Sequence, residues 1–464
     1  IDRYGKGYLE LKNGILVLHI KGSPYERGYQ HGILLSKQIT ETAIKGLTGA
    51  AAVVAYNQGC SFEEGFERLR QGEREAEGFI PPEFREEMAG IADALAKTGS
   101  QLDLHDVLLW NTMYDSWCFF AHPNSSNQAQ TFERQKYPIG CSSFSAWGEA
   151  TRDGTFIFGK NMDNLNLPGI LEGRMLVVCD PDNGLGHVNV SHPGMIAIDG
   201  GINENGIEMM TQYSPSIYET MRGCGIGVLS RLILQNASRV DDALNILTVY
   251  PRCTGINYHV GDAKAQRAIV IETNAKQIAF RRPYKQDILW TTNHYNCYPG
   301  WMGYQGENLV EGQKLAFCLK DVKSIESWQE SLKDKSNPYL SATGRFRQYE
   351  KLLSELYGEI TMESGIEILS DRHNPDTGEL RDWETAPKAR NDGNTIAFWA
   401  DPTTFAEKVK VYKSNLETSI VAHTGNLWSM IATPLNGDFR IAMSDFPAQR
   451  GPYVHFNLFE ELNR

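Results

Sequence analysis

GCSSFSAWGEATRDGTFIFGKNMD, residues 140 to 163, decides the fold because it predicts a β-hairpin around the Arg152-Asp153-Gly154 loop. A three-residue loop with Gly154 in the left-handed conformation would pair Ser143 with Asp163 and place Cys141 and Asp163 on one face of the sheet. A two-residue loop would place them on opposite faces, since a slip of one residue inverts every side chain. The sequence alone leaves both registers open.

Cys141 begins the first of these strands directly after residues 119 to 139, which lack apolar periodicity and predict an exposed connector. Cleavage of the bond between Gly140 and Cys141 would make the cysteine a new amino terminus. Its α-amine, with an ordinary pKa near ~8, could then take the thiol proton without any histidine. Gly140 suits such a bond because a residue without a side chain tolerates a strained backbone. The alternative is an ordinary buried cysteine.

Three further residues are candidates for the same chemistry. In the first register, Asp163 lies close enough to hold the α-ammonium of Cys141, although turns contain many ordinary aspartates. Asn293 ends the apolar run LWTTNHY, and an amide there either donates to an oxyanion or simply terminates a strand. Arg345, near the start of a helix predicted over residues 343 to 356, either supports the site or is a solvated surface cation.

The first third of the chain predicts mainly helices. Residues 15 to 20 read as a strand, a turn follows, and helical periodicity then continues to about residue 117. Gly28 and Gly32 lie four residues apart in the first helix and cost about 1 kcal/mol each against alanine. They therefore predict a closely packed neighbour.

After the hairpin, short strands dominate. A helix is expected over residues 227 to 248. The expected strands are residues 174–179, 187–190, 195–198, 207–212, 256–260, 268–272, 288–292, 394–402, 427–434 and 439–447. Many half-buried strands with a few long helices predict an α+β fold of stacked sheets covered by helices.

The composition excludes several classes of protein. Of the 464 residues, 41% are hydrophobic and 22% charged, which excludes a disordered chain, and no apolar run is long enough for a membrane span. The net charge of -12 argues against binding nucleic acid. The eight cysteines form no CxxC pair, so we expect neither a metal site nor a cofactor. The chain starts at Ile1, which indicates that an upstream segment was removed or left out.

Four motifs together resemble the isopenicillin N acyltransferase (acyl-CoA:6-aminopenicillanic acid acyltransferase) family of N-terminal-nucleophile (Ntn) hydrolases. They are GSPYERGYQHG (22 to 32), GCSSF (140 to 144), GKNMD (159 to 163) and TNHY (292 to 295). Their order and spacing match over most of the chain. The pair formed by Cys141 and GKNMD is also similar to acid ceramidase, N-acylethanolamine amidase and choloylglycine hydrolases.

The resemblance implies an Ntn-hydrolase αββα four-layer sandwich with an N-terminal mainly helical segment, made as an inactive precursor. Residues 1–140 would be the helical propeptide or α chain, which stays associated, and residues 141–464 the catalytic β chain of one integrated domain. In the processed protein, Cys141 would be the nucleophile and Asp163 would bind its α-amine. Asn293 would line the oxyanion hole, and Arg345 would support the site.

The same motifs imply further site residues and partners. Lys160, Asn161, His294 and Tyr295 are candidates for substrate binding, and Lys160 stands where bile-salt hydrolases and ceramidases have an arginine. The substrate would be a small-molecule amide or acyl compound, with acyl-CoA or another acyl donor as a partner. The residues leave homo-oligomerisation and the compartment open. The resemblance alone favours a secreted or periplasmic protein.

Other classes of protein predict different features. A papain-like cysteine protease would begin a helix at Cys141, whereas the sequence there predicts a strand. A zinc hydrolase lacks the spacing of its ligands. A non-catalytic or unprocessed Ntn-fold binding protein would keep the bond before Cys141 intact, so a denaturing gel distinguishes it from the self-processing enzyme.

Overall fold

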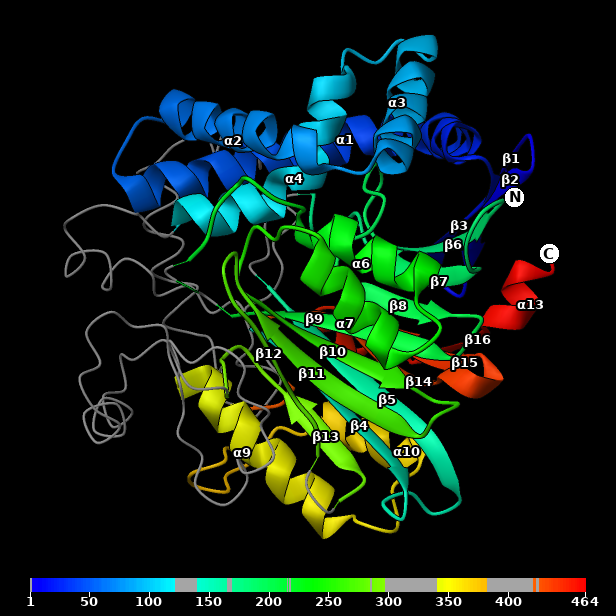
Figure 1. Ribbon diagram of the computed structural model, residues 1–464, viewed down its shortest axis with the longest axis vertical. Coiled ribbons are helices and arrows are strands. Elements are labelled where there is room, and N and C mark those ends of the chain that lie inside the picture. Colours follow the sequence, from blue (N-terminus) through cyan, green and yellow to red (C-terminus); the bar gives the residue numbers. More distant parts are fainter. Residues whose placement is uncertain are drawn as a thin grey trace.

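The fold consists of two β-sheets that lie face to face, with helices on the outer side of each sheet (Figure 1). It is seen in a computed structural model, which describes residues 2–121, 140–164, 169–214, 216, 218–283, 286–296, 340–381, 420–422 and 425–464. The order of layers is helix, sheet, sheet, helix. The predicted αββα sandwich of the α+β class is therefore confirmed.

The larger sheet joins strands from both sides of residue 140. Its order is β1-β2-β3-β6-β7-β8-β9-β10-β11-β12, and its pairs are antiparallel except β3 with β6. The strands are β1 (Asp2–Tyr4), β2 (Gly7–Lys12), β3 (Ile15–Gly22), β6 (Met175–Pro181), β7 (His187–Ser191), β8 (Gly200–Asn203), β9 (Ile207–Tyr213), β10 (Ile256–Asp262), β11 (Arg267–Thr273) and β12 (Ile278–Arg281). The N-terminal segment thus supplies part of this sheet, while its division at residue 140 stays a prediction.

The smaller sheet carries the hairpin with Cys141. Its order is β13-β4-β5-β14-β15-β16, and every pair is antiparallel. The strands are β4 (Gly140–Gly148), β5 (Gly154–Asp163), β13 (Ile288–Thr291), β14 (Asn426–Thr433), β15 (Asp438–Ala442) and β16 (Val454–Asn457). Phe156 and Phe158 of β5 share one buried apolar cluster with Val178 and Met210 of the larger sheet. Burial of this cluster holds the two sheets together.

The helices cover both sheets and fill the N-terminal part. They are α1 (Pro24–Gln58), α2 (Phe62–Ala76), α3 (Pro82–Lys97), α4 (Leu104–Ala121), α6 (Ile226–Asn236), α7 (Val240–Val249), α9 (Leu340–Glu355), α10 (Met362–Leu369) and α13 (Leu458–Leu462), with 3-10 turns η1 (Glu77–Phe79), η3 (Pro434–Asn436) and η4 (Ala448–Arg450). Helices α6 and α7 pack on the larger sheet, and α9 and α10 pack on the smaller one. In the described part of the chain, we find no helix that is both long and apolar enough to cross a membrane.

The first helix packs closely against α3, as its glycines predict. Ser23 starts α1 with a capping box, in which Ser23 and Glu26 each bond the backbone N–H of the other. A Cβ on Gly28 would lie 1.8 Å from the carbonyl oxygen of Glu87, and one on Gly32 would lie 2.5 Å from Cβ of Ala94. Glycine is required at both positions because the two backbones nearly touch.

The hairpin forms, but with neither of the predicted loops. Gly148 pairs with Gly154, so residues 149 to 153 form a longer connection, and the ladder is irregular between Ala146 and Gly148. Gly154 does have the left-handed conformation, with φ of +78°. The loop is fixed by a distant segment, since Arg152 donates its backbone N–H to the carbonyl oxygen of Ile360 at 3.1 Å.

The observed register corrects the first of our two alternatives. Ser143 pairs with Lys160 rather than with Asp163, and Cys141 pairs with Met162. Because pairs of neighbouring residues point to opposite faces, the side chains of Cys141 and Asp163 lie on opposite faces of the smaller sheet. Cys141 faces the larger sheet, and Asp163 faces α9.

Two other elements differ from expectation. No strand forms over residues 195–198, because Trp110 and Asn111 of α4 bond the backbone of residues 193, 194 and 196 in place of a neighbouring strand. The helix expected over 227–248 is divided into α6 and α7, since the Asp242 carboxylate caps a new start by accepting from the backbone of Ser238 and Arg239. Of the expected connector, residues 119–121 belong to α4 and the rest lies outside the described residues, as does the strand expected over 394–402.

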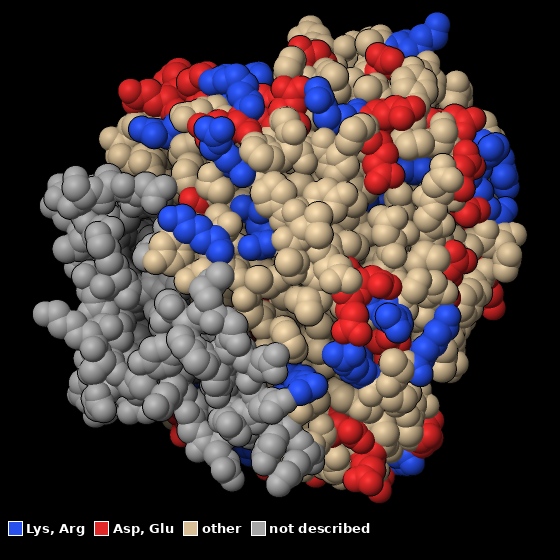
Figure 2. Space-filling model, in the orientation of Figure 1, with Lys and Arg blue, Asp and Glu red and all other residues tan. Residues whose placement is uncertain are grey.

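The surface carries both signs of charge. On the face shown in Figure 2, lysine and arginine side chains are interspersed with aspartate and glutamate between uncharged areas. The mixture agrees with the modest net charge of -12.

Candidate active site

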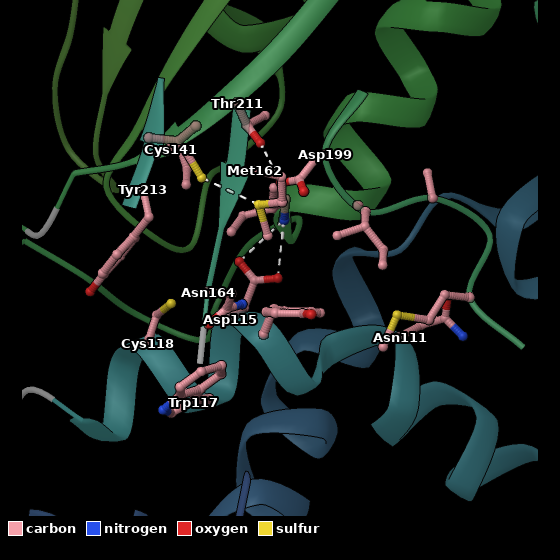
Figure 3. A pocket seen from close by; sticks show the side chains of 17 residues that line it. Asn111, Asp115, Trp117, Cys118, Cys141, Met162, Asn164, Asp199, Thr211 and Tyr213 are labelled. Carbon is pink, nitrogen blue, oxygen red and sulfur yellow. Dashed lines mark hydrogen bonds between the residues drawn. The ribbon is translucent and has the colours of Figure 1, made fainter. Parts of the chain in front are cut away.

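Cys141 lies on the inner face of β4, and its thiol faces a pocket. The side chain is 3% exposed, and its Sγ lies 3.3 Å from Sδ of Met162 (Figure 3). The pocket is lined by Asn111, Tyr114, Asp115, Trp117, Cys118, Cys141, Met162, Asn164, Met195, Ala197, Ile198, Asp199, Thr211, Tyr213, Ile226, Gly227 and Ile256. Residues of α4 therefore face the thiol across a mostly apolar space.

The thiol of Cys141 is protonated at neutral pH in the intact chain. Burial raises its pKa to about 11, the Lys160 ammonium works against this effect, and the carboxylates of Asp199 and Asp163 add to it. The thiolate is the nucleophilic form of cysteine. Attack by Cys141 therefore requires a base that removes the thiol proton.

No histidine among the described residues is hydrogen-bonded to this thiol. The ring nitrogens of His259 are instead bonded to the hydroxyls of Ser143 and Ser145, at 2.8 and 3.0 Å. A strand, not a helix, begins before Cys141. Both observations disagree with a papain-like arrangement.

Asp163 and Arg345 form a buried pair on the outer face of the same strands. Nη1 of Arg345 lies 3.9 Å from Oδ2 of Asp163 and donates to the carbonyl oxygen of Cys141 at 2.6 Å. Oδ1 of Asp163 accepts from Asn426 at 2.8 Å, whereas Oδ2 has no hydrogen bond within the described part of the molecule. A Cβ on Gly140 would lie 2.9 Å from this Oδ2. The free carboxylate oxygen thus lies beside the residue that cleavage would release.

Gly140 is needed here for space rather than for strain. Its φ is not among the positive values of this chain, so a left-handed conformation does not require glycine here. A side chain would instead meet Oδ2 of Asp163 and Nη2 of Arg345, the latter at 3.2 Å.

Asn293 holds the backbone nitrogen of Cys141. Its Oδ1 accepts from the Cys141 N–H at 2.7 Å and from Nη2 of Arg345 at 2.9 Å, while its Nδ2 donates to the carbonyl oxygen of Tyr213 at 2.8 Å. The Nδ2 group has two N–H donors, and its bond to Tyr213 uses one of them. The structure therefore brings Asn293 to Cys141 through its Oδ1 as an acceptor, and the expected donation to an oxyanion stays a prediction.

Lys160 lies beneath the pocket and does not line it. Its Nζ donates to the carbonyl oxygen of Thr211 and lies 5.9 Å from the ring centre of Trp428. The fully buried ammonium is thus held by a backbone carbonyl and an aromatic face. Its influence on Cys141 is electrostatic.

The other three residues proposed to bind substrate belong to the framework around the site. Asn161 donates to two backbone carbonyls at 2.9 and 3.0 Å. Nδ1 of His294 lies 3.0 Å from a threonine hydroxyl, and Tyr295 donates to a backbone carbonyl at 2.8 Å. None of the three lines the pocket described above.

The sequence analysis missed the residues that shape the pocket opposite Cys141. Asp199 follows a short apolar run and precedes Gly200-Gly201, a pattern that we interpreted as the end of a strand. Its acidic side chain before a pair of glycines was the available signal. For Tyr114, Asp115 and Cys118 of α4 the sequence offers no such signal. It does not show which face of a helix packs against a strand that is distant in the sequence.

Two groups of residues could hold a metal ion, and both lie outside the pocket. They are Glu10, His19 and Glu461, and Glu73, Glu77 and His105, and only the described residues were compared. Glu461 is already paired with Lys12 at 2.7 Å, and Arg464 lies 3.1 Å from Glu10. The carboxylates of the first group are therefore already paired with lysine and arginine side chains.

The order of layers defines the architectural class, an αββα sandwich with a buried cysteine at the start of an inner strand. The family model described as acyl-coenzyme A:6-aminopenicillanic acid acyl-transferase matches residues 150–412, more than half of the chain. The chain belongs to this family. An uncharacterized protein of Archaeoglobus fulgidus is 28% identical over 407 residues, which are 85% of this chain and 65% of the length of that relative.

The chain is also similar to solved structures. One is a Caenorhabditis elegans ortholog of N-acylethanolamine-hydrolyzing acid amidase, at 13% identity and a TM-score of 0.37 over 64% of this chain and 93% of that one. Another is a mutant of conjugated bile acid hydrolase from Clostridium perfringens, at 12% identity and a TM-score of 0.33 over 69% of this chain and 93% of that one.

Proposed function

We propose that this chain is a self-processing hydrolase or acyltransferase that acts on linear amide C–N bonds through a thioester on Cys141. Cleavage of the bond between Gly140 and Cys141 activates it, and residues 1–140 remain bound to residues 141–464. Membership of the acyltransferase family supports the class of reaction. The surroundings of Cys141 support the finer statement.

The position of the Cys141 backbone nitrogen carries the proposal. It lies 2.7 Å from Oδ1 of Asn293, and the preceding residue, Gly140, lies against the free Oδ2 of Asp163. When Gly140 departs, an α-ammonium at this place has two acceptors within reach. The thiol of the same residue points to the other face and into the pocket, so one residue can supply both nucleophile and base.

Processing needs only the chain itself and water. Sγ of Cys141 bonds to the carbonyl carbon of Gly140, the C–N bond breaks, and the released nitrogen takes the proton that the thiol lost. Water then hydrolyses this thioester, which leaves a carboxylate on Gly140 and a free amine and thiol on Cys141. A buried thiol with a pKa of about 11 makes the first step slow.

The catalytic cycle repeats this chemistry on a substrate. The α-amine takes the thiol proton, Sγ bonds to the substrate carbonyl, and the C–N bond breaks as the α-ammonium returns its proton to the leaving amine. Water or an acceptor amine then attacks the thioester, which yields an acid or a new amide and restores the thiol. An acyl-CoA donor would enter by the same thioester exchange and is consistent with the family.

Asn293 has two roles in this cycle, as an acceptor for the α-amine and, as we expected, as a donor to the oxyanion. Its Oδ1 holds the α-amine, while one N–H of its Nδ2 donates to the carbonyl of Tyr213. The second N–H of Nδ2 can donate to an oxyanion while the bond to Tyr213 is kept. Arg345 fixes Asn293 and the Cys141 carbonyl at once.

Mass spectrometry and a denaturing gel of the purified protein test the proposal. We expect two fragments, residues 1–140 and 141–464, and a mass increase on Cys141 when an amide or thioester substrate is added. An intact chain that still hydrolyses amides would contradict it. An intact and inactive chain would favour a non-catalytic or unprocessed binding protein, for which the buried, protonated thiol is also suited.

A further inference from the structure

One carboxylate oxygen in the Cys141 pocket has no hydrogen-bond partner. Asp199 is 7% exposed, and its Oδ1 accepts from the Thr211 hydroxyl at 2.9 Å (Figure 3). Its Oδ2 is buried without a partner among the residues that the structure describes. Leaving a buried acceptor unpaired is unfavourable, and more so for a charged group. This oxygen is therefore available to a ligand.

The other carboxylate of the pocket is fully engaged. Both oxygens of Asp115 accept from the backbone N–H of Ile226, at 3.2 and 3.0 Å, and Oδ1 also accepts from the hydroxyl of Thr254 at 3.0 Å. Asp115 thereby caps the start of α6. It serves the fold, whereas Asp199 keeps one acceptor free.

The backbone on either side holds Asp199 in place. Directly after it, a Cβ on Gly200 would lie 1.8 Å from the carbonyl oxygen of Met209, and one on Gly201 would lie 1.8 Å from that of Val188. The two glycines let β8 approach both neighbouring strands. Asp199 thus directly precedes the first residue of a tightly paired strand, which fixes its backbone.

The nearby cation does not satisfy Asp199. Burial raises the pKa of the Asp199 carboxyl, and Lys160 only partly offsets this effect. Its ammonium, however, is bonded to the backbone carbonyl of Thr211 and does not line the pocket. Oδ2 of Asp199 still needs a donor from inside the pocket.

The remaining lining sets the character of the ligand. Apolar side chains dominate it, among them Trp117, Met162, Met195, Ile198 and Ile256. A ligand that fits has an apolar body and one strong donor. Since an ammonium in an apolar site must be paired, a lone carboxylate selects the amine-bearing molecule over its neutral analogue.

We propose that the pocket binds the acyl part of the substrate and that Asp199 recognises a positively charged amine on that acyl group. The substrates are then amides of apolar amino acids with a free amine. The acyl part is assigned because Sγ of Cys141 faces the pocket and retains the acyl group in the thioester. This assignment rests on the proposed function and adds the class of substrate to it.

A matched pair of substrates tests the assignment on the processed protein. L-phenylalanine p-nitroanilide carries the amine, and 3-phenylpropionic acid p-nitroanilide lacks it but is otherwise alike. We expect kcat/KM to be at least about tenfold higher for the amine-bearing anilide, the ratio that corresponds to 1.4 kcal/mol. An equal or higher value for the neutral anilide would overturn the assignment.

Two variants show whether Asp199 is responsible. Asp199→Asn keeps the shape and the acceptor for Thr211 but removes the charge, so we expect the preference for the amine to fall about tenfold or more. Asp182→Asn, at an exposed aspartate in the turn after β6, should keep the wild-type ratio. An unchanged ratio in Asp199→Asn would refute the role of Asp199 even if the preference exists.

Failure of the proposed function gives a different result. Acylation of Cys141 by p-nitrophenyl acetate, detected by mass, reports the nucleophile without needing the amine. Absence of acylation in processed protein would contradict the proposed function. If acylation occurs but neither anilide is cleaved, the two anilides are compared as inhibitors of acylation, and tighter inhibition by the neutral one would overturn the role of Asp199.

Discussion

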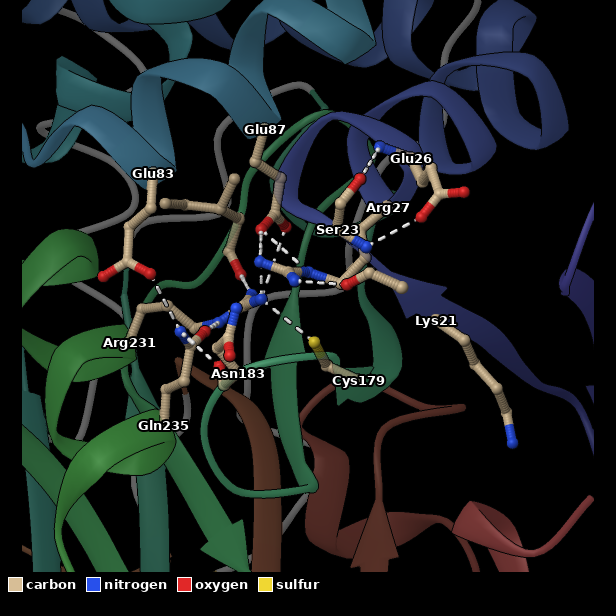
Figure 4. Close-up of polar contacts among 12 residues, drawn as sticks. Lys21, Ser23, Glu26, Arg27, Glu83, Glu87, Cys179, Asn183, Arg231 and Gln235 are labelled. Carbon is tan, nitrogen blue, oxygen red and sulfur yellow. Dashed lines mark hydrogen bonds and ion pairs between the residues drawn. The ribbon is translucent and has the colours of Figure 1, made fainter.

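Two buried clusters of charge in this protein look alike but differ in how completely they are bonded. In the first, between α1, α3 and α6, the carboxylate of Glu87 accepts from Arg27 at 2.6 and 3.1 Å and from Arg231 at 3.2 Å (Figure 4). In the second, beside Cys141, Oδ2 of Asp163 has no hydrogen bond among the described residues, and Arg345 lies 3.9 Å from it.

The difference separates a structural cluster from a candidate catalytic one. The arginines of the first cluster also bond the carbonyls of Gly22 and Ile196, at 2.8 and 2.9 Å, so its groups are bonded from several elements. Such a cluster fixes how the helices pack. The second cluster keeps an acceptor free at the point where cleavage would create an α-ammonium. An incomplete set of bonds is what a site for a new charge requires.

Removal of the nucleophile should have the largest effect. We expect Cys141→Ala to abolish both the cleavage before residue 141 and the formation of a thioester, because no other group supplies the sulfur. The gel should show one intact chain, and mass spectrometry should find no acyl adduct. Cys60→Ala, at a partly exposed cysteine after α1, is the matched control and should be processed normally. Processing of Cys141→Ala would refute the mechanism.

Loss of the carboxylate in the structural cluster should reduce stability instead. Glu87→Gln leaves Arg27 and Arg231 buried without their anion, which costs about 3–5 kcal/mol. Chemical denaturation measures the change in the free energy of unfolding. The folded fraction should still be cleaved before Cys141, since the hydrogen bonds of this cluster do not involve Cys141, Asp163, Asn293 or Arg345. Stable but uncleaved protein would show that our separation of the two clusters is wrong.

The pH dependence sharpens the same test. Burial works to raise the pKa of Glu87, but Arg231 and Arg27 outweigh it, so the pKa lies below its ordinary value of 4.5. A depressed carboxyl pKa contributes stability that is present above about pH 4.5 and is lost as the pH falls through the folded-state pKa. The advantage of wild type over Glu87→Gln should therefore be constant above about pH 5 and should shrink in acid. A difference that grows in acid would contradict the charge cluster.

Asp163→Asn should slow processing and turnover with a smaller loss of stability than Glu87→Gln. The amide keeps the bond with Asn426 when its oxygen takes the place of Oδ1, but it cannot attract an α-ammonium as a carboxylate does. We expect rates about 10²-fold lower, the lower end of what acid–base groups contribute. Asp153→Asn, at the exposed loop of the same hairpin, is the control. A loss of stability without a loss of rate would make Asp163 purely structural.

Much of the fold could be predicted because its signals are local. The helical periodicity over α3 and the two glycines of α1 are such signals, and the helices and their close packing formed as expected. The register of the hairpin could not be predicted, because the loop is held by Ile360, some two hundred residues away in the sequence. The strand expected over 195–198 failed for the same reason, since α4 takes its backbone bonds.

For the site, too, local signals could be predicted from the sequence and long-range ones could not. Cys141, Asp163 and Asn293 stand in short motifs and Arg345 near the start of a predicted helix, and the structure brings all four together. What the motifs could not give was direction: the faces of Cys141 and Asp163, and the orientation of the Asn293 amide. Asp199 was missed because its meaning depends on the apolar wall of α4 opposite it.

The smallest effect that we predict tests the space around the bond to be cut. In Gly140→Ala the new Cβ would lie 2.9 Å from Oδ2 of Asp163 and 3.2 Å from Nη2 of Arg345. Both groups are buried, so the Asp163 carboxylate must shift to make room for the new Cβ. Overpacking of this kind costs about 1–3 kcal/mol. We expect the cleavage rate to fall roughly tenfold, the factor given by about 1.4 kcal/mol.

A matched glycine isolates that effect. A Cβ on Gly78 meets nothing within 4 Å, so Gly78→Ala should be processed at the wild-type rate. Gel sampling over time after translation measures both variants. Once cut, the Gly140→Ala protein should turn over substrate normally, because the residue has left the α-amine. If Gly140→Ala is cleaved at the normal rate, Asp163 does not need to lie against residue 140. The cluster at Asp163 would then no longer differ in function from the cluster at Glu87.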